Sequence, residues 1–307
     1  MTVIKTKNLT KKFGNFLAVN ELNITVEHGQ VYGFIGKNGA GKTTTINMIL
    51  SLIKATNGQV FINDELVDFK DSSYKQKIGF VSDVPVFPNH MNAKEYLIYV
   101  GELFGIKGVT LKESVFEVLK FVGLDNTKKL VKSYSRGMKQ RLAIAASLVN
   151  DPDILIMDEP TSALDPIGRK QVIDIIDKLR GKKTIFYSTH ILNDVERVCD
   201  SVCLIDKGNI IVQDTVENIK KHYYLNRYLV DTNNNVLLKG ILINSTWIKY
   251  VDNHKEGLIF EYSDEDLYKE KFLALLIDNN IHLNELRKLN MNLEDIFVKV
   301  VNHEDAN

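Results

Sequence analysis

The sequence has little cysteine and no long apolar run. Its only cysteines, Cys199 and Cys203, have no neighbouring cysteine or histidine at zinc-finger spacing, so we expect two buried thiols in a reducing cytoplasm. No apolar run approaches the roughly 18 to 20 residues of a membrane-spanning helix, and the start MTVIKTKNLTKKFG lacks the pattern of a signal peptide. A role at a membrane would therefore need another chain to cross the bilayer.

An excess of charge of one sign is also absent. The 307 residues include 39 Lys and Arg and 39 Asp and Glu, and 44% of the chain is hydrophobic. Balanced charge provides no basic field for nucleic acid, so we expect no DNA or RNA partner. The length is sufficient for a large domain, alone or with a smaller one, and for a core that needs no disulfides.

Short apolar strands alternate with amphipathic helices over residues 1 to about 215. This alternation is typical of an α/β domain with a largely parallel sheet. One helix is expected to begin with Asp165 as its N-cap and Pro166 at its first position, where a missing N–H is tolerated. The predicted strands cover 31–35, 77–82, 154–158, 184–189 and 201–206.

The composition changes near residue 222. Asparagine-rich turns, at 233–235 and at Asn253, separate short strand-like runs such as 258–262. We therefore divide the chain into a large domain over 1–220 and a small accessory α+β domain over 221–307.

A last helix is predicted over 292–301. Its apolar residues, Leu293, Ile296, Phe297 and Val300, share one face, which should pack against another element. The small domain carries no ligand-binding motif, and its role stays open between regulation, dimerisation and little function of its own.

The segment GKNGAGKT (36–43) lies between a predicted strand and a predicted helix, which is the context of a P-loop. Glycines let the backbone N–H groups surround a phosphate, and the helix N-terminus favours its negative charge. Lys42 would reach the β- and γ-phosphates, and the Thr43 hydroxyl would bind Mg²⁺. The residues expected to bind ATP here are Gly36, Asn38, Gly39, Ala40, Gly41, Lys42, Thr43 and Thr44.

Two carboxylates follow the strand 154–158, at the sheet edge where open α/β folds bind their ligands. Adjacent carboxylates at a strand end could also be a solvated loop. Beside a P-loop, phosphoryl transfer gives each of them a task. Asp158 would hold Mg²⁺, and Glu159 would activate the attacking water as general base.

From this point the motifs resemble those of the ABC ATPase family, over about residues 2–215. The segment YSRGM (134–138) resembles the family signature, usually Leu-Ser-Gly-Gly-Gln, although by itself it is typical of a helix cap. The resemblance implies that Ser135 and Gly137 contact the γ-phosphate of an ATP held by a second subunit.

Three more positions receive roles through the resemblance. The segment 162–165 resembles the D-loop, which adds Asp165 to the nucleotide-binding set. His190 resembles the switch histidine that contacts the γ-phosphate, and Phe13 stands where the family has an aromatic ring that stacks on adenine. Taken alone, His190 and Phe13 would be a structural histidine and a core aromatic.

Three residues depart from the general family pattern. Asp83 replaces the glutamine that senses Mg²⁺ and contacts the membrane partner, so we include Asp83 in the metal set with Thr43 and Asp158. Arg136 and Met138 replace a glycine and the glutamine of the signature. These features, with the LEDIF segment (293–297), resemble the drug and antimicrobial-peptide export branch of bacitracin and lantibiotic type.

The resemblance implies a P-loop ATPase with a RecA-like core, an N-terminal antiparallel β subdomain and a helical signature subdomain. It also implies ATP and Mg²⁺ as ligands, a dimer with itself or a similar ATPase, and a separate integral-membrane permease. We expect such a protein at the cytoplasmic face of a bacterial cell membrane, with Glu159, His190 and Lys42 as its catalytic residues. The alternatives are an importer motor and a soluble ATPase that acts on ribosomes or DNA.

One further segment, 85–134, carries an aromatic series whose members we expect to be mostly core. The family docks a cytoplasmic helix of the permease in this region, beside Asp83. The series consists of Phe87, Tyr96, Tyr99, Phe104, Phe116 and Phe121.

Overall fold

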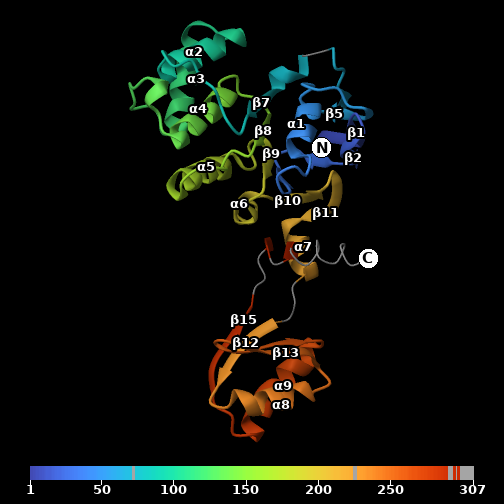
Figure 1. The fold of residues 1–307 in the computed structure, drawn as a ribbon. Coiled ribbons are helices and arrows are strands. Elements are labelled where there is room, and N and C mark those ends of the chain that lie inside the picture. Colours follow the sequence, from blue (N-terminus) through green and yellow to red (C-terminus); the bar gives the residue numbers. More distant parts are fainter. Residues whose placement is uncertain (71–72, 224–226, 290–292, 295, 298–307) are drawn as a thin grey trace. The chain divides into compact units, whose positions relative to one another are not determined.

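The chain divides into two units, Met1–Val216 and Glu217–Asn307, whereas the sequence places the boundary between residues 220 and 221. The computed structural model describes residues 1–70, 73–223, 227–289, 293, 294, 296 and 297. The elements are labelled in Figure 1.

A six-stranded sheet forms the centre of the first unit, in the order β11-β10-β4-β9-β8-β7. Five of its strands are parallel, and β11 pairs antiparallel with β10. The five predicted strands are these parallel strands, and β7 is two residues shorter than predicted, one at each end. The sheet consists of β4 (Val31–Ile35), β7 (Ile78–Val81), β8 (Ile154–Asp158), β9 (Thr184–Thr189), β10 (Ser201–Asp206) and β11 (Asn209–Thr215).

The register of this sheet brings distant chemical residues to one edge. Ile35 lies opposite Thr189, and Asp158 lies opposite Ser188. Because parallel strands end at the same edge, the P-loop, the carboxylates and the segment after β9 meet there.

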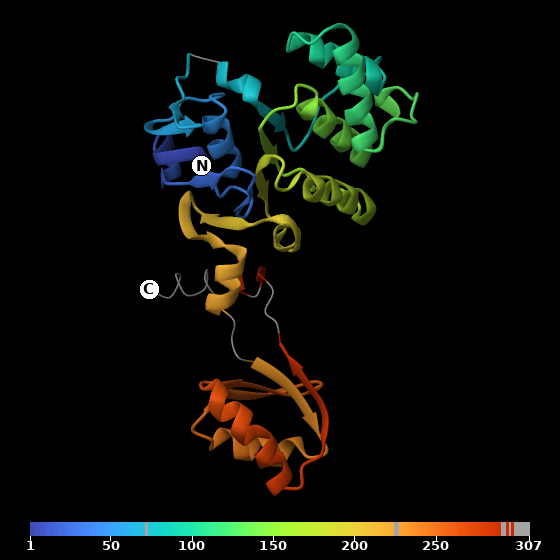
Figure 2. The ribbon, with the colours of Figure 1, turned by 180° about the vertical axis from the view of Figure 1, so that it is seen from behind.

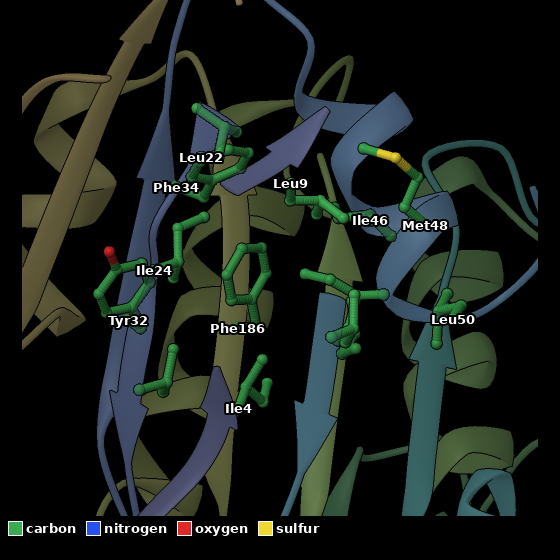
Figure 3. Close-up of a cluster of buried hydrophobic side chains, with 14 of the residues drawn as sticks. Ile4, Leu9, Leu22, Ile24, Tyr32, Phe34, Ile46, Met48, Leu50 and Phe186 are labelled. Carbon is green, nitrogen blue, oxygen red and sulfur yellow. The ribbon is translucent and has the colours of Figure 1, made fainter. Parts of the chain in front are cut away.

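A second sheet, of antiparallel strands, packs on the first near the N-terminus. Its order is β2-β1-β5-β6, and β3 pairs with β1. Figure 3 shows Ile4, Leu9 and Leu22 of this sheet against Phe34 and Phe186 of the central sheet, with Ile46 and Met48 of the P-loop helix closing the same core. The strands are β1 (Thr2–Phe13), β2 (Phe16–Leu22), β3 (Thr25–Glu27), β5 (Asn57–Ile62) and β6 (Glu65–Leu66).

Six helices lie within the first unit among its described residues, and a seventh, α7, begins at the last residue of this unit and otherwise belongs to the second. Figures 1 and 2 show α2–α4 grouped on one side of β7–β9 and the antiparallel sheet with α1 on the other. The helices are α1 (Lys42–Ile49), α2 (Ala93–Leu103), α3 (Gly108–Phe121), α4 (Arg136–Leu148), α5 (Pro166–Leu179), α6 (Leu192–Val198) and α7 (Val216–Tyr223), with short 3-10 turns at Ser73–Lys77 and Val131–Ser133.

The prediction that most aromatics of segment 85–134 belong to the core is wrong. Tyr99, Phe104 and Phe116 are exposed, and Phe87, Tyr96 and Phe121 are only half-buried. Aliphatic side chains such as Leu97 and Leu111 fill the core of the helical subdomain instead, and Leu111 packs so closely on Gly101 that an added Cβ would lie 2.2 Å from Leu111 Cδ1. The aromatic rings therefore remain at the surface.

The second unit is a four-stranded antiparallel sheet, in the order β13-β14-β12-β15, with α8 and α9 on one face (Figures 1 and 2). Trp247, Phe260 and Phe272 are buried between the sheet and the helices. The elements are β12 (Arg227–Thr232), α8 (Asn235–Ile243), β13 (Ile248–His254), β14 (Gly257–Tyr262), α9 (Glu265–Asp278) and β15 (Leu283–Lys288).

Of the two predicted asparagine-rich turns, the first is present at 233–234 and the second is displaced. Asn234 caps α8 by accepting a hydrogen bond from the N–H of Leu237, and Asn235 already begins the helix. Asn253 lies within β13, because the hairpin turn falls at 255–256, where Gly257 supplies a positive φ of 139°. The strand predicted at 258–262 is β14.

The predicted helix over 292–301 lies partly outside the described residues. Its described residues are helical, and Leu293, Ile296 and Phe297 are buried, as expected of an apolar face. Val300 is outside them. Among the described residues, no helix has the length and apolar character needed to span a bilayer.

Candidate functional site

The loop between β4 and α1 is a tight backbone cradle. Gly41, the N-cap of α1, has a φ of 107°, and a Cβ added there would lie 2.7 Å from the carbonyl oxygen of Ala18. A Cβ on Gly36 would lie 2.6 Å from the carbonyl oxygen of Ile205. Only glycine fits these positions, so the loop is held closely by the chain around it.

The N-terminus of α1 suits an anion. Within the described residues no side chain caps it, and its first turn has no acidic residue. Free N–H groups and the positive end of the helix dipole favour phosphate. Asn38 and Gly39 are exposed at the tip of the loop, Thr44 is half-buried, and the carbonyl of Ala40 accepts a 3.0 Å hydrogen bond from the N–H of Gly208.

Lys42 is the buried cation of this site, with only 6% of its side chain exposed. Its Nζ donates hydrogen bonds to the carbonyl oxygens of Gly36 at 2.6 Å and Lys37 at 3.2 Å. Glu159 Oε1 lies 3.0 Å from the same Nζ. The ammonium group is thus folded back onto its own loop and one carboxylate, partners that a bound phosphate would replace.

Thr43 and Asp158 bring a hydroxyl and a carboxylate together. Thr43 Oγ1 donates a 2.8 Å hydrogen bond to Asp158 Oδ2, and Ser188 Oγ donates one of 2.6 Å to Asp158 Oδ1. Asp158 is almost completely buried, whereas Thr43 is exposed. Hydroxyl and carboxylate oxygens are the ligands that Mg²⁺ takes beside a bound phosphate.

Glu159 connects the P-loop to the segment after β9. Its Oε2 lies 2.8 Å from His190 Nδ1, and its other oxygen faces Lys42. Its φ of 49° is unusual for a residue with a Cβ, and its N–H is held by the carbonyl and hydroxyl oxygens of Ser188, both at 3.1 Å. Hydrogen bonds and ion pairs thus join Lys42, Thr43, Asp158, Glu159 and His190, which come from three separate segments.

The predicted signature and D-loop residues form a second group. Ser135 caps α4, its Oγ accepting a 3.2 Å hydrogen bond from the N–H of Met138. Asp165 caps α5 as predicted, with Pro166 next to it, and accepts from the N–H of Gly168 at 3.0 Å. A Cβ on Gly137 would lie 3.5 Å from Gly168 Cα, so the two helix starts are in contact. In the part of the chain that is described, no hydrogen bond or ion pair joins this group to the P-loop.

Asp83 and Phe13 lie outside the P-loop group, and Asp83 contacts the D-loop segment. Asp83 Oδ1 accepts a 2.5 Å hydrogen bond from Ser162 Oγ, at the start of the D-loop segment. Phe13 ends β1 with about half of its surface exposed (50%), and Lys11 Nζ lies 5.0 Å from its ring centroid. Phe13 is therefore available to a flat ligand, in contrast to the core position that its residue type alone suggests.

Two contributions to the site are not apparent in the motifs. Ser188 binds both Asp158 and the backbone of Glu159. Asp194, in the first turn of α6, accepts hydrogen bonds from Thr161, Tyr187 and Arg169. The only sequence signal for Ser188 is a polar pair, Ser-Thr, that ends an otherwise apolar strand.

Cys199 and Cys203 are free and buried, as predicted. Burial raises the pKa of the Cys203 thiol to about 12, and that of Cys199 further. Both thiols therefore stay protonated at neutral pH and take no part in the chemistry of the site.

The arrangement combines an anion cradle, a cation, a hydroxyl–carboxylate pair and a second carboxylate beside a histidine. These are the groups needed to hold a nucleoside triphosphate and to activate water against its terminal phosphate. A base and an imidazole within hydrogen-bond distance suit proton movement.

The comparison of sequences agrees with this site. Residues 19–162 match the family described as ABC transporter. The bacitracin transport ATP-binding protein BcrA of Bacillus licheniformis is 40% identical over 305 residues, which cover 98% of this chain and 97% of that protein. The Nod factor export ATP-binding protein I of Burkholderia lata is 37% identical over 209 residues, covering 67% and 69%.

Solved structures agree as well. The ADP conformation of an ATP-binding cassette of an ABC transporter has a TM-score of 0.65 at 27% identity, over 71% of this chain and 92% of that one. A dimeric cassette in a post-hydrolysis state, bound to ADP and Pi, has a TM-score of 0.62 at 27% identity, over 69% and 98%. The chain belongs to the ABC transporter ATP-binding family, in its bacitracin-type branch. It is an ATPase subunit.

Proposed function

We propose that this chain is the motor of an exporter, which dimerises on Mg-ATP and drives a separate permease that expels a drug, an antimicrobial peptide or another amphipathic substrate. The observation that carries this proposal is the 40% identity to a bacitracin transport ATPase over 98% of the chain, the accessory domain included. The likeness to a Nod factor export ATPase supports export rather than import.

In this proposal each site residue has a task in hydrolysis. Lys42 releases Glu159 and binds the β- and γ-phosphates, while the N–H groups of the P-loop surround them. Freed from Lys42, the Glu159 carboxylate accepts a proton from the attacking water. His190 Nδ1 lies 2.8 Å from Glu159 Oε2, so His190 holds the base in place. Its second task is to orient the γ-phosphate. Phe13 stacks on the adenine.

Thr43 and Asp158 would hold Mg²⁺, which fits their hydroxyl–carboxylate contact of 2.8 Å. The ion would offset the charge of the β- and γ-phosphates. In the described chain the Asp83 carboxylate does not contact Thr43 or Asp158. It accepts a hydrogen bond from Ser162 instead. We expect Thr43→Val to lose most of the effect of Mg²⁺ on ATP affinity, while Asp83→Asn keeps it; equal losses would assign Asp83 to the metal after all.

A second ATPase chain is proposed to complete the site. The signature residues Ser135 and Gly137 lie at the start of α4, separate from the P-loop group of the same chain. The likeness to a dimeric cassette bound to ADP and Pi supports a sandwich of two chains. Mg-ATP should therefore convert Glu159→Gln, which binds but does not hydrolyse, from monomer to dimer in sedimentation. Protein that stays monomeric where wild type turns over would contradict the proposal.

A groove between the helical subdomain and the edge of the central sheet is the proposed dock of the permease. It has a volume of about 530 Å³ and is lined by Leu52, Phe80, Tyr96, Leu103 and Phe104 among others. Several of these side chains are exposed, which is unusual for large apolar residues and typical of an interaction surface. The hydrogen bond from Ser162 to Asp83, three residues after Phe80, supports a link from this groove to the D-loop segment.

Charge in the groove should block assembly. We expect Leu103→Asp to prevent co-purification with the permease while ATP binding stays at the wild-type level. Phe116→Asp is the matched control, because Phe116 is an exposed aromatic of α3 outside the groove. Equal co-purification of both variants would count against the groove.

The decisive experiment identifies the partner. Glu159→Gln is trapped with Mg-ATP in detergent-solubilised native membranes, and the co-purifying proteins are identified by mass spectrometry, with Lys42→Ala as the control that binds no ATP. A multi-spanning membrane protein supports a location at the cytoplasmic face of the membrane and the transport role. Ribosomal or DNA-repair proteins would overturn it, and an importer permease would overturn export alone.

A further inference from the structure

Asp194 is a buried carboxylate outside the P-loop and signature groups. It lies in the first turn of α6, four residues after His190, and only 7% of its side chain is exposed. Its Oδ2 accepts hydrogen bonds from Thr161 Oγ1 at 2.8 Å and Tyr187 OH at 3.2 Å. Its Oδ1 accepts from Arg169 Nε at 2.7 Å.

Two of the three partners of Asp194 lie at the ends of the D-loop segment 162–165. Thr161 immediately precedes this segment, and Arg169 is in the first turn of α5, whose N-cap is Asp165. One carboxylate therefore holds the two ends of a turn whose backbone is unusual at Ala163, with a φ of 63°, and Glu159, two residues before Thr161, also has a positive φ of 49°. Such conformations persist only when surrounding contacts enforce them.

The network is closed and fully paired. Thr161 Oγ1 and Tyr187 OH are 3.0 Å apart and both lie within hydrogen-bond distance of Asp194 Oδ2, so their two hydroxyl protons are shared among three contacts, while the Arg169 N–H donates to Oδ1. Burial raises the pKa of Tyr187 well above its ordinary value, and the negative charge of Asp194 raises it further, so the hydroxyl remains a donor. A polar network of this kind is rigid, and the loss of one donor leaves a buried group unpaired.

The hydrogen bonds of Asp194 join the same two chain segments as the contact between His190 and Glu159. His190 and Glu159 meet in a part-buried contact, while Asp194 and Thr161, which follow them by four and two residues, meet in a buried one. We infer that Asp194 is a positioning residue, which couples the His190 segment to the D-loop segment through Thr161 and Arg169 and so sets the geometry of hydrolysis without contacting ATP. The inference rests on the proposed roles of Glu159 and His190.

The test separates positioning from folding by kinetics. Thr161→Val keeps the shape of the side chain and removes the donor, whereas Thr161→Ser keeps the hydroxyl. We expect Thr161→Val and Asp194→Asn to lower kcat by at least about tenfold with KM for ATP nearly unchanged, because small displacements of a catalytic group have effects of this size. Thr161→Ser should retain most of the wild-type kcat. The double variant Thr161→Val/Asp194→Asn should be no worse than its poorer parent, because the two residues act through one contact.

A matched control lies on the same pair of helices. Arg197 Nη2 donates to Asp174 Oδ1 at 2.5 Å, which joins α6 to α5 at the solvent side, so Arg197→Gln removes an α5–α6 ion pair without touching the network. It should keep the wild-type kcat. The fraction of folded protein, followed by thermal unfolding, normalises every rate.

Each outcome has a definite meaning. Wild-type kcat per folded protein in Thr161→Val or Asp194→Asn, or a rise in KM with kcat unchanged, would overturn the inference and leave the network purely structural. An equal loss of kcat in Arg197→Gln would also overturn it. Glu159→Gln separates the proposed role of Glu159 from the coupling through Asp194. If Glu159→Gln hydrolyses ATP normally, the proposed role of Glu159 fails. If Glu159→Gln is inactive and Asp194→Asn is fully active, only the coupling is refuted.

Discussion

The pairing of Lys42 with Glu159 predicts that the general-base variant binds nucleotide more tightly than wild type. In the described structure the buried Lys42 Nζ lies 3.0 Å from Glu159 Oε1, so a nucleotide phosphate must replace this carboxylate. Glu159→Gln removes the charge of the competitor and keeps its shape. It should therefore release Lys42 for phosphate.

The size of the effect follows from the contact. A hydrogen bond to a charged group contributes about 1.5–3 kcal/mol. Glutamine retains part of this by offering a neutral oxygen, so we take the lower end, about 1.5 kcal/mol, which corresponds to about tenfold in affinity. Hydrolysis should fall by roughly a hundredfold to ten-thousandfold in the same variant, because the proton acceptor is lost.

The assay is calorimetric titration with ADP in EDTA. ADP is not hydrolysed and lacks the γ-phosphate expected to close a dimer, and the absence of Mg²⁺ isolates the contact with Lys42. Asp151→Asn is the control, since it removes the carboxylate beside Lys183 in a pair where Asp151 is 90% exposed, and we expect no change from it. Lys42→Ala should lose affinity. Unchanged or weaker binding of ADP to Glu159→Gln would refute the competition.

Three further predictions concern the cradle, the thiols and the accessory domain. Gly41→Ala should weaken nucleotide binding at least about tenfold, because the φ of Gly41 is 107° and an added Cβ would meet the carbonyl of Ala18. Its control is Gly14→Ala, at a φ of 57° with open space around it, which should leave the calorimetric titration with nucleotide unchanged. The pKa of the Cys203 thiol is raised to about 12 and that of Cys199 further, so above about pH 9 the unfolded chain releases protons that the folded chain keeps. The free energy of unfolding in urea should therefore fall by about 2 kcal/mol per thiol between pH 8 and 10.5, and less in the variant with both cysteines changed to alanine; an identical fall would contradict the assignment. Phe272→Ala, which removes a fully buried ring, should destabilise the second unit by about 3–5 kcal/mol, seen as faster hydrogen exchange over 227–289; unchanged exchange would argue against its core position.

The sequence alone predicts the class of fold and the chemical residues, because both depend on local patterns. Apolar runs of four to six residues followed by glycine or paired carboxylates indicate parallel strands that end in ligand-binding loops, and all five predicted strands are present. The cap at Asp165 is equally local, since it depends on the residue type and the proline after it. The family that the motifs resemble is confirmed by similarity along nearly the whole chain.

Patterns fail where burial depends on how elements approach one another. The surface rings of Tyr99, Phe104 and Phe116 have the residue type of a core, and only the packed structure shows that aliphatic side chains such as Leu111 fill the subdomain instead. Asn253 has the residue type of a turn, but the hairpin closes two residues later, where Gly257 takes the positive φ.

Tertiary structure alone decides the partners of each charge. The motifs name Lys42, Glu159 and His190, yet no spacing in the sequence predicts that Glu159 bridges the other two, because the contacts follow from the order of β4, β9 and β8 in the sheet. The link from Asp194 to Thr161 is of the same kind: the residues are 33 positions apart and meet because β8 and β9 are neighbours. The sequence by itself thus determined which chemical groups are present, since residue type and local pattern specify them, and the packing of parallel strands decided which of those groups meet.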